Sequence, residues 1–248
     1  MAILTQFVLR LCFGLALGMA LTDPRQVTSG YYRNHLYVLL GLTVLAALVA
    51  LGAPEQFVLA PPLAAAVLSY LGSVAWLYEK PRFGIPILWL VAACALWGAW
   101  ADMPPVPSDC AGAMALAWLD PPTSGLVLGM TMAAMFLGHW YLNSPTMAIG
   151  PLQRLVVLMA AAVAIRAIVA GADLALLVSD GWPSTSTWLF LALRWLAGIV
   201  GALMLALMTW QTLKIPNTQS ATGILYVGVI VTFIGELLAL LLATPPGT

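Results

Sequence analysis

The chain has 248 residues, of which 62% are hydrophobic and 7% are charged, and its mean hydropathy is +1.00. Soluble domains carry about 25% charged residues, so this composition excludes a soluble globular protein and predicts an integral membrane protein surrounded by membrane lipids. Nine basic and nine acidic residues cancel. The balance excludes both the basic stripe that a nucleic-acid partner requires and a polybasic patch for anionic lipid.

The first apolar run could be mistaken for a cleaved signal peptide. It has no positively charged start, and Arg10 interrupts it, so we interpret it as a retained first membrane helix.

A membrane-spanning helix needs roughly 20 mostly apolar residues, and proline, glycine and charge mark the breaks between such runs. The sequence contains eight runs, at residues 2–22, 35–53, 57–78, 85–101, 124–143, 153–179, 187–213 and 221–243. The connections are mostly short. We therefore predict an all-α bundle of about eight transmembrane helices, arranged as up-and-down hairpins in one polytopic domain (1–248).

Basic residues near the ends of the spans collect on the cytoplasmic side of a membrane. Six basic residues lie between the predicted spans or at a span end, and all six belong to connections from an odd-numbered to an even-numbered span: Arg25, Arg33, Lys80, Arg82, Arg154 and Lys214. In the remaining connections, all the charged residues are acidic. This asymmetry predicts a bacterial inner-membrane protein with both termini on the outer, periplasmic side.

Five charged residues lie deeper inside the predicted spans, where an ionised group must face the bundle interior or water. They form a predicted buried charge layer, comprising Arg10, Arg166, Asp173, Arg194 and Glu236. From the helical rise, all of them except Arg166 lie about 9–12 Å below the outer interface, and Arg166 lies nearer the midplane. We predict ion pairs among Arg10, Asp173, Arg194 and Glu236, without assigning partners.

Two interpretations of this layer remain open. In one, the charges are a satisfied polar core that fixes how the helices pack. In the other, Asp173 or Glu236 exchanges a proton, or the surplus charge of Arg166 holds an anionic substrate or a quinone carbonyl.

A second candidate site lies at the predicted cytoplasmic corner. The stretch GHWYLNSPTM, residues 138–147, is read in the main as the polar end of a helix, with interfacial rings and turn residues. Amides and hydroxyls also accumulate near residues 210–226. Their side chains could form a shallow pocket for a quinone or lipid head group. The candidate cofactor-binding residues are His139, Gln211, Gln219 and Tyr226.

Haem b is disfavoured, because only His35 and His139 could ligate it and His35 is placed at the outermost residue of its span. The segment 102–123 is predicted to be a solvated, proline-stiffened outer loop or docking surface. Its Asp102, Asp109 and Asp120 give only a weak indication of a cation site.

Catalytic patterns are lacking. Cys12, Cys94 and Cys110 form no CxxC pair, and no HExxH, GxSxG or P-loop spacing occurs. We identify no catalytic residue and no metal site, and the sequence favours a protein that is not an enzyme on its own.

The sequence predicts an integral subunit of a larger membrane complex with protein partners, in the electron-transfer or respiratory class. A small-solute or proton-coupled transporter and a lipid-active membrane enzyme are the alternatives.

Overall fold

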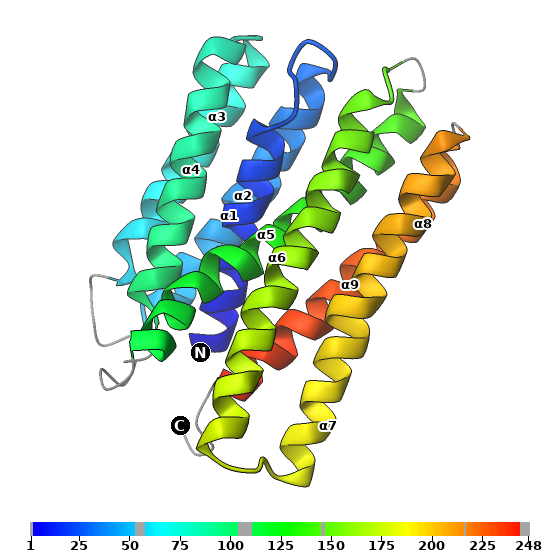
Figure 1. Cartoon of the computed structure of the whole chain (residues 1–248). Coiled ribbons are helices and arrows are strands. Elements are labelled where there is room, and N and C mark those ends of the chain that lie inside the picture. The colour runs from blue at the N-terminus through cyan, green and yellow to red at the C-terminus, as the bar shows by residue number, and fades with distance from the viewer. Residues whose placement is uncertain (1, 53–57, 104–110, 145–146, 216, 244–248) are drawn as a thin grey trace.

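The chain folds as a helical bundle (Figure 1). This computed structural model describes residues 2–52, 58–103, 111–144, 147–215 and 217–243, and those residues contain no β-strand. The helices are α1 (Ala2–Ala20), α2 (Ser29–Ala50), α3 (Ala60–Leu77), α4 (Pro81–Ala101), α5 (Ala111–Asn143), α6 (Gly150–Asp180), α7 (Thr185–Leu193), the π-helix η2 (Arg194–Gly201), α8 (Ala202–Lys214) and α9 (Thr218–Ala243).

The all-α architecture predicted from hydropathy is confirmed. Within the described residues, eight helices are long and apolar enough to cross a membrane. The predicted seventh span corresponds to α7, η2 and α8 together, which form one continuous helix over Thr185–Lys214.

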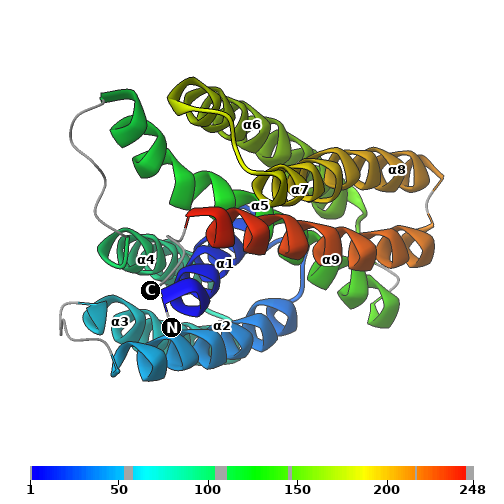
Figure 2. The ribbon, with the colours of Figure 1, turned by 90° about the horizontal axis from the view of Figure 1, so that it is seen from below.

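Two helices form the centre of the bundle. In α1, 78% of the residues in Ile3–Ala20 are buried, against 39% in α2. Figure 2 shows α1 enclosed by α2, α4, α5 and α9. The helix α5 runs obliquely across the bundle, and it packs on α1, on α6 and on α9 (Figures 1 and 2). The first four helices therefore meet the last four mainly through α1 and α5.

The connections alternate between the two ends of the bundle (Figure 1). The connections α1–α2, α3–α4, α5–α6 and α8–α9 lie at the end that we call the basic end, because they carry the basic residues listed above. The opposite end holds the start of α1, the end of α9 and the α6–α7 connection. The hairpin pattern expected from the short connections is thus the one observed.

Glycines allow α1 and α5 to cross in direct backbone contact. A Cβ atom placed on Gly14 would lie 1.8 Å from the carbonyl oxygen of Gly125, and one on Gly129 would lie 1.9 Å from the carbonyl carbon of Gly14. Small residues at a crossing let helix backbones approach closely. This crossing fixes the position of α1 relative to α5.

The prediction that segment 102–123 is an outer loop is wrong for residues 111–123, which form the first turns of α5. Pro121 and Pro122 lie inside this helix and remove two backbone donors. The Trp118 carbonyl, which the N–H of residue 122 would otherwise bind, accepts a hydrogen bond of 3.1 Å from the Trp100 indole on α4. An oblique helix also needs more residues to cross a given thickness, which accounts for the 33-residue length of α5.

Candidate functional site: a buried ion-pair network

Arg166 on α6 is the centre of a network of charged side chains inside the bundle. It is one of the largest side chains that are fully buried. Its Nε and Nη2 atoms donate to the two carboxylate oxygens of Glu236 on α9, at 2.9 and 2.7 Å. Its Nη1 atom donates to Oδ1 of Asp120 at 2.7 Å and to the Thr123 hydroxyl at 3.2 Å, both on α5. One guanidinium therefore joins three helices.

Arg10 extends the network to the first half of the bundle. Its Nη1 atom donates to Oδ2 of Asp120 at 2.5 Å, so the Asp120 carboxylate bridges the two arginines. Its Nε atom donates to the Gln6 side chain at 3.1 Å, and the Gln6 amide donates to the Ala99 carbonyl on α4 at 2.8 Å. The chain of polar contacts thus runs continuously through α4, α1, α5, α6 and α9.

The four ionised groups of this network sum to zero charge: Arg10 and Arg166 against Asp120 and Glu236. Removing a charge from water costs several kcal/mol, and only close pairing with further hydrogen bonds offsets this cost. The bidentate Arg166–Glu236 pair has the geometry that gives the strongest such bonds. The network therefore has the features of a satisfied polar core.

Arg194 and Asp173 form a second, separate pair. The Arg194 Nη1 atom lies 3.6 Å from Oδ2 of Asp173, whose side chain is 61% exposed, whereas the Arg194 side chain is only 7% exposed. The predicted set of Arg10, Asp173, Arg194 and Glu236 is thus divided between two clusters. Arg10 pairs with Asp120, which the sequence analysis had assigned to the outer loop.

Asp120 also changes the charge balance expected for Arg166. Arg166 was expected to carry a positive charge without a counter-ion, but two carboxylates, those of Asp120 and Glu236, neutralise it. Asp120 is not available as a cation ligand, because both of its oxygens accept from arginines. Asp109, proposed with it, lies outside the described residues. In the described part of the chain, no three His, Cys, Asp or Glu side chains are grouped to hold a metal ion.

Asp102 lies next to the network, directly after α4. Its Oδ2 atom is buried and has no hydrogen-bond partner. Burial raises the pKa of this carboxyl above its usual range, and the neighbouring Gln6 amide opposes the shift. Protonation is therefore easier here than in water.

At the basic end, the structure brings together two of the four predicted cofactor-binding residues. The Tyr226 hydroxyl on α9 and Nδ1 of His139 on α5 are 3.1 Å apart, and both side chains are exposed. The helices meet closely here, since a Cβ atom on Gly138 would lie 2.8 Å from the Thr222 hydroxyl. Gln211 and Gln219 are also exposed but make no hydrogen bond to this pair.

Most of the stretch from residue 138 to residue 147 links elements of the basic end. The Trp140 indole donates to the Thr28 hydroxyl at 2.8 Å, and the Tyr141 hydroxyl donates to the Ala148 carbonyl. Pro145 and Thr146 lie outside the described residues.

His35 does not lie at the edge of its helix, which is a correction to the sequence analysis. The helix α2 begins at Ser29, so His35 is nearly two turns inside it and is buried. Nδ1 lies 2.6 Å from the Tyr31 carbonyl, and the ring packs against Tyr31 and Phe136 at centroid distances of 4.5 and 4.4 Å. The observed contacts of His35 are those of a packed core residue.

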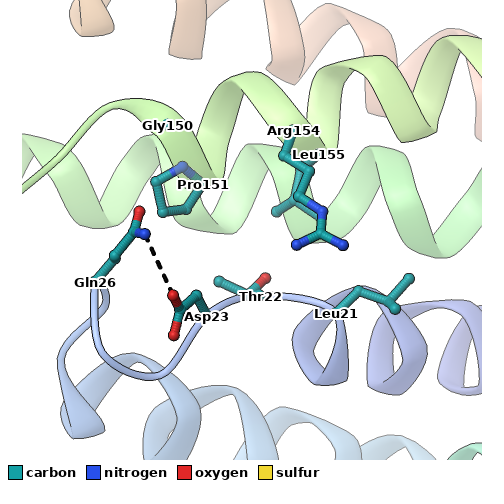
Figure 3. Close-up of a pocket in the computed structure, with 8 residues that line it drawn as sticks. All are labelled: Leu21, Thr22, Asp23, Gln26, Gly150, Pro151, Arg154 and Leu155. Atoms are coloured by element: carbon teal, nitrogen blue, oxygen red, sulfur yellow. Dashed lines mark hydrogen bonds between the residues drawn. The ribbon is translucent and has the colours of Figure 1, made fainter.

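An open cavity of about 260 Å³ lies between the α1–α2 connection and the start of α6 (Figure 3). Eight residues line it: Leu21, Thr22, Asp23, Gln26, Gly150, Pro151, Arg154 and Leu155. Asp23 accepts a hydrogen bond from Gln26 at 3.2 Å, and the Arg154 side chain extends toward the α1–α2 connection (Figure 3). Only Arg154 among these residues is named from the sequence, for its charge, because the lining comes from segments far apart in the chain.

Comparison of the chain with protein-family models, with curated proteins and with solved structures found no match.

Proposed function

We propose that the chain is an integral membrane subunit of a larger complex, with its basic end in the cytoplasm and both termini on the outer, periplasmic side of a bacterial inner membrane. Eight apolar helices and many large apolar side chains on the surface support insertion. The collection of basic residues at one end supports the orientation.

The buried network supports a structural role for the charge layer. Each of its arginines contacts a carboxylate, and its net charge is zero. The polar contacts run from helix to helix, from α4 through α1, α5 and α6 to α9. A proton path across a membrane would instead need titratable groups spaced along its thickness. We therefore propose that the network holds the two halves of the subunit together.

The observation that carries the proposed role in a complex is the exposed His139–Tyr226 pair. Because both groups are exposed, their hydrogen-bonding atoms are open to a ligand or a partner. The imidazole and phenol groups can donate hydrogen bonds to the carbonyl oxygens of a quinone ring or to a lipid head group. An electron-transfer complex with a quinone near its cytoplasmic side would supply both a ligand for this pair and protein partners for the subunit.

This proposal predicts that Tyr226→Phe and His139→Phe each lower the quinone bound per protein, by about tenfold, because each removes a hydrogen-bonding group. The measurement is mass spectrometry of lipids and proteins retained by the chain after gentle purification in nonionic detergent. Tyr37→Phe is the matched control, since Tyr37 is an exposed tyrosine on α2. Equal quinone in all the proteins, or no quinone and no partner in any of them, would contradict the proposal.

One observation favours the transporter alternative. The Asp120 side chain is 32% exposed, although it lies within the network, and Asp102, which neighbours Gln6, has an unpaired buried oxygen. If these carboxylates exchange protons with the outer side, Asp120→Asn should abolish proton-coupled flux into liposomes while the protein stays folded. Loss of folding together with flux would instead support the structural role.

A further inference from the structure

Arg194 is a buried cation whose hydrogen-bonding groups are not used within the described residues. Its side chain is 7% exposed, and its single ion contact, to Asp173, is 3.6 Å long. A guanidinium has five N–H donors, and those of Arg194 make no hydrogen bond within the described residues. Both carboxylate oxygens of Glu236 accept from Arg166, and Glu236 makes no hydrogen bond to Arg194. Apart from Asp173, the described residues therefore supply no acceptor for the Arg194 guanidinium.

The next residue adds a second unpaired donor. The indole Nε1 atom of Trp195 is buried without a hydrogen-bond partner. The Trp195 ring faces α6, at 3.7 Å from the position of a Cβ atom on Gly171, and Arg194 faces Asp173 two residues further along α6. The Asp173 carboxylate is mostly exposed and can remain in solvent. Two neighbouring donors beside α6 match a group that offers several acceptor oxygens and negative charge.

The local backbone supports a specialised site. Arg194 is the first residue of the π-helix η2, and π-helical turns occur frequently at functional sites. The same segment is pressed against α9, where a Cβ atom on Gly198 would lie 2.6 Å from Cα of Gly235. This contact places η2 close to the residue that precedes Glu236.

Arg194 lies in the outer half of its membrane-spanning helix. Twenty residues, or about 30 Å of helix, separate it from Lys214 at the basic end, and the helix continues beyond it to Thr185. Exposed apolar residues lie along this helix on both sides of Arg194: Leu189, Phe190 and Leu193 before it, and Leu196, Val200, Met204 and Leu207 after it. Acyl chains could lie along this stripe while a phosphate reaches Arg194.

We propose that Arg194 and Trp195 bind the phosphate group of a membrane phospholipid between α6 and η2, at the outer side of the bilayer. The shared chemistry is a phosphate accepting hydrogen bonds from a guanidinium and an indole, so free phosphate is the other source to test. The proposal depends on the membrane insertion proposed above but not on the His139–Tyr226 pair.

Native mass spectrometry of the delipidated full chain tests this site, with dioleoyl phosphatidic acid, dioleoylglycerol and inorganic phosphate as separate probes. We expect phosphatidic acid to form a one-to-one complex, with about tenfold weaker binding in Arg194→Gln and weakened binding in Trp195→Phe. Dioleoylglycerol, which has the same acyl chains without phosphate, should bind no better to the wild type than to Arg194→Gln.

Two matched controls accompany the variants: Arg82→Gln, an exposed arginine of α4, and Trp89→Phe, an exposed tryptophan of the same helix. If inorganic phosphate binds with the same dependence on Arg194, the anion site is supported and the lipid source is overturned. Phosphatidic acid binding that is unchanged in both site variants overturns the proposal. If Arg194→Gln fails to fold, Trp195→Phe decides alone. Failure of insertion would be recognised separately, as extraction of the protein without detergent.

Discussion

Replacement of Gly129 by alanine is expected to lower the free energy of unfolding by about 3 kcal/mol, the upper end of the usual cost of overpacking a core. The added Cβ atom would lie 1.9 Å from the carbonyl carbon of Gly14 and 2.1 Å from the amide nitrogen of Leu15. These are backbone atoms of α1, so no side-chain rotation can relieve the overlap. The two central helices must separate, and the measurement is the thermal midpoint of the purified protein in a fixed detergent.

Gly41→Ala is the control for this experiment. Gly41 lies inside α2, and no atom lies within 4 Å of the added Cβ position. Alanine is favoured over glycine in a helix by about 1 kcal/mol, so this variant should be as stable as the wild type or more stable. Equal midpoints for Gly129→Ala and Gly41→Ala would show that α1 and α5 do not cross in backbone contact.

The same crossing positions the ion-pair network. A Cβ atom on Gly125 would lie 2.7 Å from the Arg10 carbonyl oxygen, so the α1 backbone at Arg10 rests on α5. Asp120 lies five residues earlier on α5 and meets the Arg10 side chain. The close approach that glycine permits therefore brings the two charges within hydrogen-bond distance.

The helices were predictable from the sequence because their signal is local. Runs of apolar residues interrupted by proline, glycine and charge depend only on neighbours in the chain. The start of α5 was missed for a related reason. Pro121 and Pro122 normally end a helix, and here they are tolerated because Trp100, from another helix, satisfies the freed Trp118 carbonyl. A tertiary contact of this kind leaves no local pattern.

The ion-pair partners depend on tertiary packing as well. The seven-residue spacing of Arg166 and Asp173 placed both on one side of α6, yet Asp173 is mostly exposed and Arg166 is buried. Which carboxylate meets Arg166 depends on how α5 and α9 lie against α6. The Asp-Pro-Pro sequence at residues 120–122 is typical of a helix boundary, and only the fold shows that Asp120 meets two arginines.

Replacement of Arg166 by methionine is expected to destabilise the protein by about 3–5 kcal/mol, because it leaves Glu236 buried without a counter-ion and Asp120 with Arg10 alone. The measurement is the thermal midpoint, together with the fraction of protein that elutes as a single species after detergent extraction. Arg154→Met removes an exposed arginine from the same helix and should change the midpoint little.

The double variant Arg166→Met with Glu236→Gln separates charge from packing. It leaves the neutral Arg10–Asp120 pair intact and removes the stranded carboxylate. If unpaired charge is the main source of the loss, the double variant should be more stable than Arg166→Met alone, since a buried pair can often be replaced by neutral groups at little cost. A double variant that is less stable than Arg166→Met would assign the loss to packing and to the Glu236 hydrogen bonds. Recovery would identify charge compensation between α5, α6 and α9 as an interaction that holds the second half of the bundle together.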